Sequence, residues 1–344
     1  MPHLIMFNTI YMKKLIYLII IGVILSTSCK KEDCECTAEE VNIFMGANQA
    51  NDVYYSFNVG EVSSANRSEW DLAFSVPLRT ATIRINEGAG VLLYKVGDTT
   101  VWEAVDTSGI SAWEPLYNDN SQWMRGAFNL EADGFDFDWA IYDHGNTHNV
   151  IGQYIYVIKL SDGSYKKLYI LMRIGNTDTY VLRWADIDGL NQVDDTFSPA
   201  AYADSKHFIH YSLVNQEMIE IEPDKDSWDL LFTRYVTKIP AGEDTEIDYP
   251  VMGVLMNKDR KAVKVTGIPP ADASFTDAEE DFTNQADIIG WDWKIQDPVT
   301  HEISIVENTS YFVNISNLGI YKVYFTDYAG EAAGTLTFSQ LKVE

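Results

Sequence analysis

The stretch "SEWDLAF" at residues 68–74 returns almost unchanged as "SWDLLF" at residues 227–232. Matching residues occur in the same order in and after these two stretches, and the two members of each match are 153 to 158 residues apart. They are Trp70 and Trp228, Trp139 and Trp293, the pairs Thr147-His148 and Thr300-His301, and the tyrosine-rich runs that begin at Tyr154 and Tyr311. A nearly constant spacing of this kind predicts that one unit is written twice in the chain.

Both copies have the sequence pattern of β-strands. The run "DVYYSFNVGEV" (52–62) alternates apolar and polar residues, as a half-buried strand does. The segments "YIYVIKL" (154–160) and "YKKLYILMRI" (165–174) flank Asp162-Gly163, a pair typical of tight hairpin turns. No window carries a long helical stripe. We therefore predict an all-β fold of two tandem antiparallel β domains related by internal duplication.

Changes in composition along the chain predict the domain boundaries. We assign residues 1–29 to a lipoprotein signal peptide with its true start at Met12, 30–50 to an acidic tether, 51–190 to the first β domain, 191–205 to a polar linker, and 206–344 to the second β domain.

The N-terminal segment predicts a membrane anchor. "MKKLIYLIIIGVILSTSC" (12–29) has two lysines, an apolar run too short for a membrane span, and small residues that end at Cys29. This ending resembles a bacterial lipobox, in which the cysteine carries the lipid. The following Lys-Lys-Glu-Asp (30–33) resembles a signal for the outer face of the outer membrane. We expect a lipid-anchored, surface-exposed outer-membrane protein; the alternative is a cleaved signal and a free secreted protein.

Composition excludes several classes of function. The formal net charge of −26 over 344 residues repels phosphate backbones, so we expect no nucleic-acid partner. Apart from Cys29, cysteine occurs only at positions 34 and 36, so the β domains have neither a disulfide framework nor a thiolate metal site. Signatures of hydrolases, zinc proteases and P-loop enzymes are absent, and we predict that the protein is not an enzyme.

The Trp-Asp pairs themselves favour a structural role. We expect Trp70 and Trp228 to fill the core. Asp71 and Asp229 should accept backbone hydrogen bonds at a strand edge, because a buried carboxylate needs donors.

Three stretches resemble the HmuY haem-binding lipoprotein family. They are "YFVNISNLGIYKVYFTDYAGEAAGTLTF" (311–338), "DSWDLLFTRY" (226–235) and "YYSFNVGEV" (54–62), and the first copy follows the same plan more loosely. The resemblance implies two all-β domains in tandem, anchorage at the cell surface, and haem held between two axial side chains. It also implies uptake of haem or a related porphyrin, with an outer-membrane haem receptor as a partner.

The resemblance implies candidate ligands in the first copy. Tyr142-Asp143-His144-Gly145 matches the family's aromatic-x-His-Gly turn, which makes His144 the candidate axial ligand. Met124 is a candidate for the second axial position, because some family members use methionine there, and Tyr117 is another. His148 is a further candidate, since imidazole is a good iron ligand. Its alternative role, shared with His301, is to satisfy backbone groups in a turn. At the corresponding turn the second copy carries Pro298, which cannot bind iron.

Two other functions compete with haem binding. The first is a structural or adhesive surface lipoprotein of the same fold without an iron site. The second is a calcium-assisted carbohydrate-binding module, indicated by acidic clusters and tryptophans; beyond haem iron we expect no metal. The residues concerned are Asp133, Asp136, Asp138, the segment 186–195, Trp102, Trp113 and Trp123.

The lipobox interpretation makes a direct prediction. Cys29→Ala removes the only sulfur that the lipobox places for acylation, so incorporation of labelled palmitate should stop and the protein should leave the membrane fraction. A variant that still fractionates with membranes would contradict the lipobox interpretation.

Overall fold

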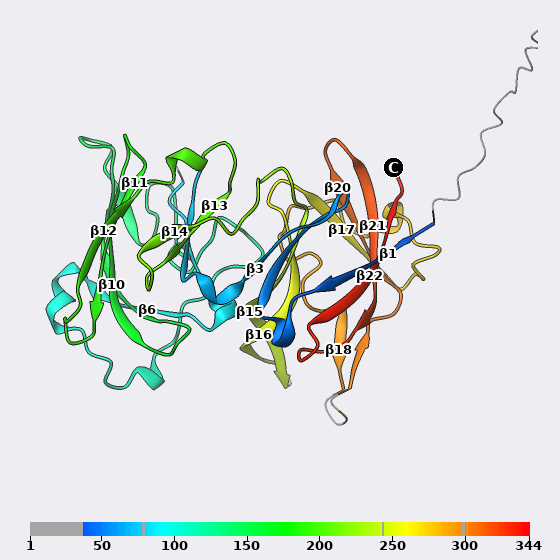
Figure 1. Ribbon diagram of the computed structural model, residues 1–344, viewed down its shortest axis with the longest axis horizontal. Helices are drawn as coiled ribbons and strands as arrows, with labels where there is room; N and C mark the ends of the chain where they lie inside the picture. Colours follow the sequence, from blue (N-terminus) through cyan, green and yellow to red (C-terminus); the bar gives the residue numbers. More distant parts are fainter. Residues whose placement is uncertain (1–36, 78–79, 243, 298–299, 301) are drawn as a thin grey trace, which may run out of the picture. The chain divides into compact units, whose positions relative to one another are not determined.

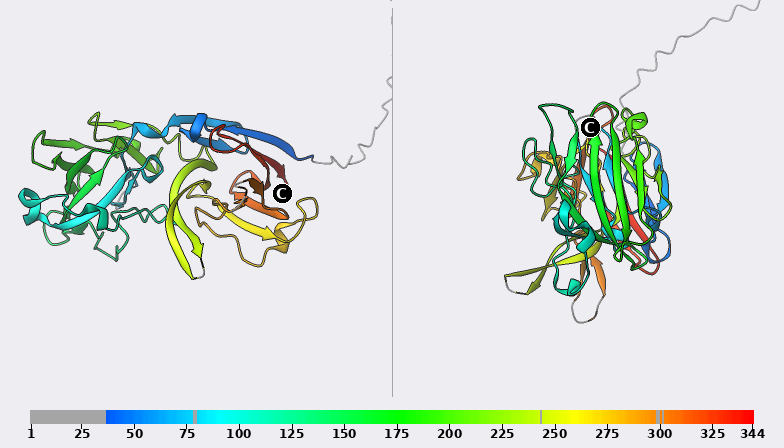
Figure 2. Two further views of the ribbon diagram at one scale, coloured as in Figure 1. Left: turned by 90° about the horizontal axis from the view of Figure 1, so that it is seen from below. Right: turned by 90° about the vertical axis from the view of Figure 1, so that its left-hand side faces the viewer.

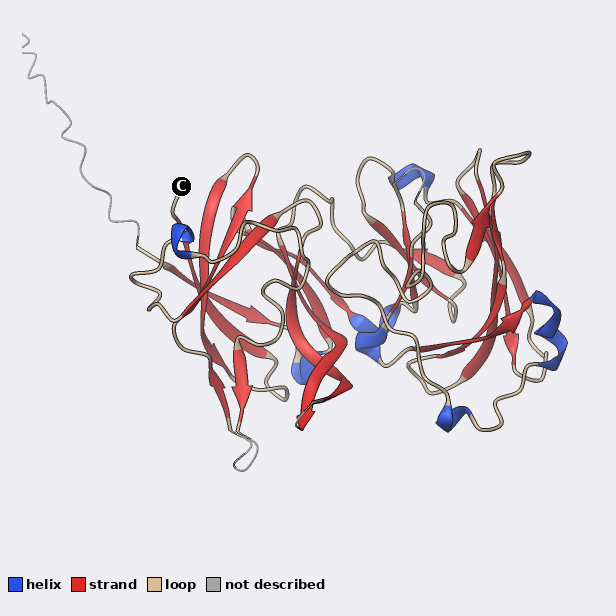
Figure 3. Ribbon diagram, turned by 180° about the vertical axis from the view of Figure 1, so that it is seen from behind, coloured by secondary structure: helices blue, strands red, loops and turns tan. Residues whose placement is uncertain are grey.

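The computed structural model describes residues 37–77, 80–242, 244–297, 300 and 302–344. These residues belong to one compact unit in which antiparallel strands predominate, joined by loops and short 3-10 turns (Figures 1 and 3). Cys29, residues 30–36 of the predicted tether and His301 lie outside the described residues, whereas residues 37–50 of the tether are described. Among the residues described, no helix is long and apolar enough to cross a membrane. The predicted all-β class is confirmed.

Two facing groups of strands make the first lobe. One sheet has the order β14 (Glu217–Ile219), β13 (Phe208–Ser212), β4 (Leu72–Ser75) and β5 (Ile83–Ile85). The other sheet has the order β12 (Val193–Phe197), β11 (Thr179–Asp186), β10 (Tyr165–Ile174), β9 (Tyr154–Lys159) and β6 (Leu92–Asp98). Further along β10, its partner is β8 (Val150–Gly152) in place of β9, and β8 in turn pairs with β7 (Ala140–Tyr142). Apolar side chains from both sheets, among them Phe74, Trp139 and Tyr180, form one core between them.

The second lobe is built in the same manner. One sheet has the order β16 (Thr245–Met256), β15 (Leu230–Gly242), β2 (Asn51–Ser56) and β3 (Gly60–Asn66). The other has the order β1 (Glu39–Phe44), β22 (Thr335–Lys342), β21 (Gly319–Tyr328), β20 (Thr309–Ile315) and β17 (Lys261–Thr266). A small ribbon is formed by β18 (Lys294–Gln296) and β19 (Ile303–Ile305). Phe232, Trp293 and Phe338 lie in the core between the two larger sheets.

Short 3-10 turns join the strands. They are η1 (Ala47–Gln49), η2 (Arg67–Glu69), η3 (Glu87–Ala89), η4 (Thr99–Ala104), η5 (Ile110–Ala112), η6 (Ala200–Tyr202) and η7 (Phe275–Asp277).

Strand pairing crosses the domain boundary that composition suggested. The N-terminal strands β1 to β3 belong to the second lobe, where β1 pairs with β22 and β2 pairs with β15 (Figures 1 and 2). The hairpin β13–β14, by contrast, pairs with β4 of the first lobe. The sheets therefore do not follow the predicted division into residues 51–190 and 206–344. A short hairpin pairs with whichever strand edge is open to it, and sequence adjacency does not fix that partner.

The aspartates of the two Trp-Asp pairs explain why the β13–β14 hairpin joins the first lobe and the β2–β3 hairpin joins the second. The Asp71 carboxylate accepts a hydrogen bond from the Leu213 backbone N–H at 2.8 Å, and the Asp229 carboxylate accepts one from the Phe57 N–H at 2.9 Å. The predicted role of both aspartates is confirmed. Trp228 is buried as expected, but Trp70 is only half-buried and its ring lies 4.6 Å from the ring of His210. The expectation that Trp70 fills the core is therefore wrong, because it packs at the edge of a polar cavity.

The pairing of β1 to β3 predicts how the chain can be divided. The isolated segment 206–344 lacks three strands of the second lobe, so it should show no cooperative thermal transition by circular dichroism. Joining residue 344 to residue 37 through a short Gly-Ser linker, in a chain that runs from 226 to 344 and then from 37 to 66, restores those strands. This permuted chain should melt cooperatively.

The linker can be short because β1 and β22 are antiparallel neighbours, with Glu39 opposite Gln340. Cooperative melting of residues 206–344 alone would show that the N-terminal strands are dispensable, and would contradict this account.

Candidate functional site

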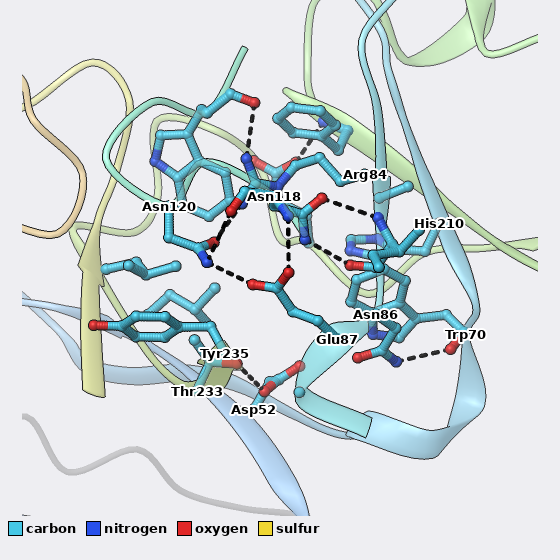
Figure 4. A pocket seen from close by; sticks show the side chains of 18 of the residues that line it. Asp52, Trp70, Arg84, Asn86, Glu87, Asn118, Asn120, His210, Thr233 and Tyr235 are labelled. Atoms are coloured by element: carbon cyan, nitrogen blue, oxygen red, sulfur yellow. Dashed lines mark hydrogen bonds between the residues drawn. The ribbon is translucent and has the colours of Figure 1, made fainter. Parts of the chain in front are cut away.

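A cavity of about 70 Å³ with many polar lining residues lies between β4, β5 and β13 of the first lobe and β2 and β15 of the second, and is here called the central cavity (Figure 4). Its wall contains Asp52, Tyr54, Trp70, Arg84, Glu87, Asn118, Asn120, Trp123, His207, Phe208, His210, Glu222, Trp228 and Arg234. Aromatic rings and charged groups therefore both line it.

Glu87 ties the two lobes together beside this cavity. It is the first residue of η3, directly after β5, and only 4% of it is exposed. Its carboxylate accepts hydrogen bonds from the Asn118 N–H, the Asn120 side-chain amide and the N–H of Val236 in β15. Burial raises the pKa of Glu87 to about 7. The next residue is glycine because a Cβ at Gly88 would lie 2.0 Å from the carbonyl oxygen of Arg234.

Arg84 lies on the opposite wall and is equally enclosed. Its guanidinium donates to the Asn120 side-chain oxygen at 2.6 Å and lies 5.2 Å from the centre of the Trp123 ring. It also donates to the backbone carbonyls of Asp119, Gln122 and Trp123. Burial lowers the pKa of Arg84 to about 10, so the group stays charged at neutral pH.

A second buried carboxyl, Glu222, completes the polar wall. It accepts hydrogen bonds from the backbone N–H groups of His207 and Phe208, at 3.0 and 2.8 Å, and from the Trp228 indole at 3.3 Å. Burial raises its pKa to about 7. Burial likewise lowers the pKa of His207 to about 4 and that of His210 to about 3, so both imidazoles are neutral at pH 7.

Two of the predicted haem ligands, His144 and His148, lie elsewhere, in the loop between β7 and β8. The Asp143 carboxylate orders this loop by accepting hydrogen bonds from the N–H groups of Gly145 and Thr147. His148 has a positive φ of 58°, and its Nδ1 lies 2.9 Å from the Tyr142 hydroxyl oxygen. The His144 ring lies 4.5 Å from the Phe135 ring and 5.8 Å from the Tyr142 ring. Both histidines are therefore exposed at one aromatic cluster.

A surface hollow of about 540 Å³ opens beside this cluster, and we call it the histidine hollow. Its lining consists of Thr80, Gly134, Phe135, Phe137, Tyr142, His148, Val150, Arg173, Gly175 and Asp178. The volume falls within the roughly 300–1,000 Å³ that is usual for small-molecule sites. Aromatic walls and one imidazole form a surface suited to a flat, largely apolar ligand, and the one guanidinium in the lining, that of Arg173, is paired with Asp178.

Met124 does not lie in this hollow. It borders a different depression with Ser121, Lys258 and Thr283, and its backbone carbonyl accepts a hydrogen bond from the Thr82 hydroxyl. The structure thus brings His144 and His148 together and puts Met124 elsewhere.

The acidic clusters of the sequence do not gather into a cation site in the part of the chain that the structure describes. Among those residues, no three His, Cys, Asp or Glu side chains are arranged to hold a metal ion. Asp138 instead forms an ion pair with Lys95.

Sequence reasoning named some wall residues of both sites, among them Trp70 and His148, and missed others. Phe135 and Arg173 carry no motif, and they reach the histidine hollow only through the pairing of β7, β8 and β10. Glu87 and Glu222 are two acidic residues among 51, and only their burial distinguishes them.

No family model matches this chain, and neither a curated protein nor a solved structure matches it. The resemblance to the HmuY family stays a prediction.

The raised pKa of Glu87 predicts a pH-dependent stability. Between the ordinary value of 4.5 and the folded value of about 7, the folded protein holds a proton that the unfolded chain has released. The contribution of Glu87 to the free energy of unfolding therefore falls as pH rises through this window, by an amount on the order of 3 kcal/mol. Glu87→Gln should remove this fall.

The measurement is urea unfolding from pH 4.5 to 7.5, with Glu61→Gln as the control because Glu61 is exposed. The Glu87→Gln variant should be less stable than wild type at pH 4.5, because its amide nitrogen replaces either Oε2, which accepts from the Asn118 N–H, or Oε1, which accepts from the Val236 N–H. This difference should shrink as pH rises to 7.5. Parallel pH profiles for wild type and Glu87→Gln would show that this carboxyl does not titrate in the window.

Proposed function

We propose that the protein is a lipid-anchored outer-membrane surface protein that binds haem or a related porphyrin in the histidine hollow for uptake. The observation that carries this proposal is the meeting of an imidazole and aromatic walls at one hollow of about 540 Å³. The lipobox at Cys29 and the resemblance to haem-binding lipoproteins support the proposal from the sequence alone.

The residues of the histidine hollow fit a haem group. With Nδ1 of His148 hydrogen-bonded to the Tyr142 hydroxyl, Nε2 is the nitrogen left to bind iron. Metal-binding histidines commonly have their second nitrogen fixed by such a partner. When bound, haem would supply an iron that accepts one or two axial ligands. His148 borders the hollow itself, and we therefore make it the leading ligand.

The walls suit the rest of a porphyrin. Phe135 and Tyr142 are stacked with their ring centres 5.7 Å apart, which gives a flat apolar surface. Arg173 also lies in the wall, but its guanidinium is buried and already paired with Asp178 at 2.8 Å, so a ligand carboxylate would have to compete with Asp178 for it.

The second axial position is assigned to His144 before Met124. His144 lies against the same aromatic cluster as His148, whereas Met124 borders another depression.

We also propose that the two lobes arose by internal duplication. Leu72 faces Tyr211 across β4 and β13, and Leu230 faces Tyr55 across β15 and β2. The order β14-β13-β4-β5 of the first lobe has the counterpart β3-β2-β15-β16 in the second. In this proposal the last three strands of the second unit were moved to the N-terminus, where they are β1 to β3.

The haem proposal is tested by titrating haem into purified residues 37–344, here called the soluble domain, and recording the Soret band. Wild type should saturate at one equivalent. His148→Ala should weaken binding about tenfold or more, since it removes an axial donor from an exposed position without emptying the core. His144→Ala should shift the Soret band if it supplies the second ligand.

Met124→Leu is the matched control, because it keeps the side-chain volume and removes only the thioether. It should bind haem as wild type does. Identical Soret titrations for wild type, His148→Ala and the double variant His144→Ala/His148→Ala would refute the assignment. A wild-type protein that binds no porphyrin would refute the proposed function.

A further inference from the structure

The depression beside Met124 is a surface hollow of about 420 Å³, here called the amide hollow. Its lining consists of Ser121, Gln122, Trp123, Met124, Lys258, Thr283, Asn284 and Gln285. Side-chain amides and hydroxyl groups therefore dominate this lining. A cavity of about 150 Å³ is enough for one benzene molecule, so the amide hollow has room for a considerably larger ligand. Its volume also lies within the roughly 300–1,000 Å³ that is usual for small-molecule sites.

The backbone around the amide hollow is held in place by contacts between distant parts of the chain. The Ser121 carbonyl accepts a hydrogen bond from the Ala286 N–H at 2.8 Å, which joins the two walls. Trp123 donates its indole N–H to the Met256 carbonyl at 2.8 Å, so its ring cannot turn freely. A ligand would therefore meet a wall that is already ordered, and binding would cost little conformational entropy.

Two glutamines supply hydrogen-bond acceptors to the hollow. The amide nitrogen of Gln122 donates to the Asp119 carboxylate at 3.5 Å, and that of Gln285 donates to the Asp287 carboxylate at 2.7 Å. Both side chains are exposed, and the carbonyl oxygen of each amide is the group left for a ligand. The ligand must therefore carry donors.

Two other side chains supply donors. The Thr283 hydroxyl oxygen accepts from the Gln285 N–H at 3.2 Å, which leaves its own O–H to donate. The Lys258 ammonium has three N–H groups and uses one of them on Asp259 at 2.7 Å. The ligand must therefore also carry acceptors. A hydroxyl group both donates and accepts, so a ligand rich in hydroxyl groups suits this lining.

The charge of the lining favours a neutral ligand. Lys258 is the one charged residue among the described residues of the lining, and Asp259 already pairs with it. Calcium needs carboxylate or carbonyl oxygens, and none of these lining residues is acidic. Binding in the amide hollow would therefore not follow the calcium-assisted mode that the acidic clusters of the sequence suggested.

Trp123 and Met124 supply the apolar part of the lining. The guanidinium of Arg84, which belongs to the central cavity, lies 5.2 Å from the centre of the Trp123 ring. Trp123 is half-buried and borders the amide hollow as well. Ligand sites usually combine an aromatic or apolar surface with a few polar groups that fix orientation. A sugar ring matches this combination, because it has an apolar C–H face and a rim of hydroxyl groups.

We propose that the amide hollow binds a neutral saccharide, without calcium. Gln122 and Gln285 accept hydrogen bonds from sugar hydroxyls, Thr283 and Lys258 donate to them, and Trp123 packs on the ring. The site is separate from the histidine hollow and does not depend on haem binding.

The test is isothermal titration of the soluble domain, without haem and in the presence of EDTA, with maltose, cellobiose, lactose, xylobiose, mannobiose and diacetylchitobiose. At least one should bind at a single site and change the tryptophan fluorescence, since Trp123 lies in the lining. Added NaCl should leave the dissociation constant unchanged, because salt screens only contacts between charges.

Two variants remove single acceptors at exposed positions. Gln122→Ala and Gln285→Ala should each raise the dissociation constant about fivefold, the effect of one lost hydrogen bond. Gln192→Ala is the matched control. Gln192 is likewise exposed and donates its amide nitrogen to an aspartate, Asp194, at 3.0 Å, but it lies outside the lining. This control should bind as wild type does, and thermal melts identify any variant that fails to fold.

Failure of all six disaccharides to bind the wild-type domain would overturn the proposal. Equal binding by wild type and the double variant Gln122→Ala/Gln285→Ala would overturn it as well, by locating the saccharide at another surface. Binding that appears only when Ca²⁺ replaces EDTA would contradict the calcium-independent mode.

Discussion

Two buried carboxylates, those of Asp71 and Asp229, determine which strands of this protein pair. Only 2% of Asp229 is exposed, and its oxygens accept hydrogen bonds from the Phe57 N–H and from Arg260 at 2.8 Å. A buried carboxylate without such donors is costly, so the segment after β2 is held at the start of β15. Asp71 holds Leu213 at the start of β4 in the same manner. These two contacts bring the N-terminal strands to the second lobe and β13 to the first.

The central cavity depends on this arrangement, and the histidine hollow does not. The central cavity exists because β2 and β15 face β4, β5 and β13, and Glu87 connects the two groups through Val236. The histidine hollow depends instead on the first lobe alone. Trp139, which is 1% exposed, donates its indole N–H to the Ala81 carbonyl and fixes the chain just before β7. The loop that carries His144 and His148 therefore starts from a rigid position, which suits a site that must hold a ligand at the surface.

The sequence predicts the local parts of this structure and fails where partners are distant. The hairpin β9–β10 follows from alternating residues around Asp162-Gly163, and the structure has Gly163 at the required positive φ of 86°. The roles of Asp71 and Asp229 follow from the chemistry of a carboxylate in an apolar strand. The pairing of β2 with β15 does not follow, because residues 53 and 232 are far apart in the chain and each could pair elsewhere. Glu87 and His210 likewise become distinctive only through burial, which no short pattern encodes.

The most direct test of the functional account is hydrogen–deuterium exchange of the soluble domain with and without one equivalent of haem. The account predicts slower exchange in two segments, 134–150 and 173–178, because they contain nearly all of the histidine hollow. Exchange around the central cavity, at residues 84–88 and 207–211, should stay unchanged. Haem-induced protection that is confined to the second lobe, or no protection anywhere, would contradict the claim that this hollow is the porphyrin site.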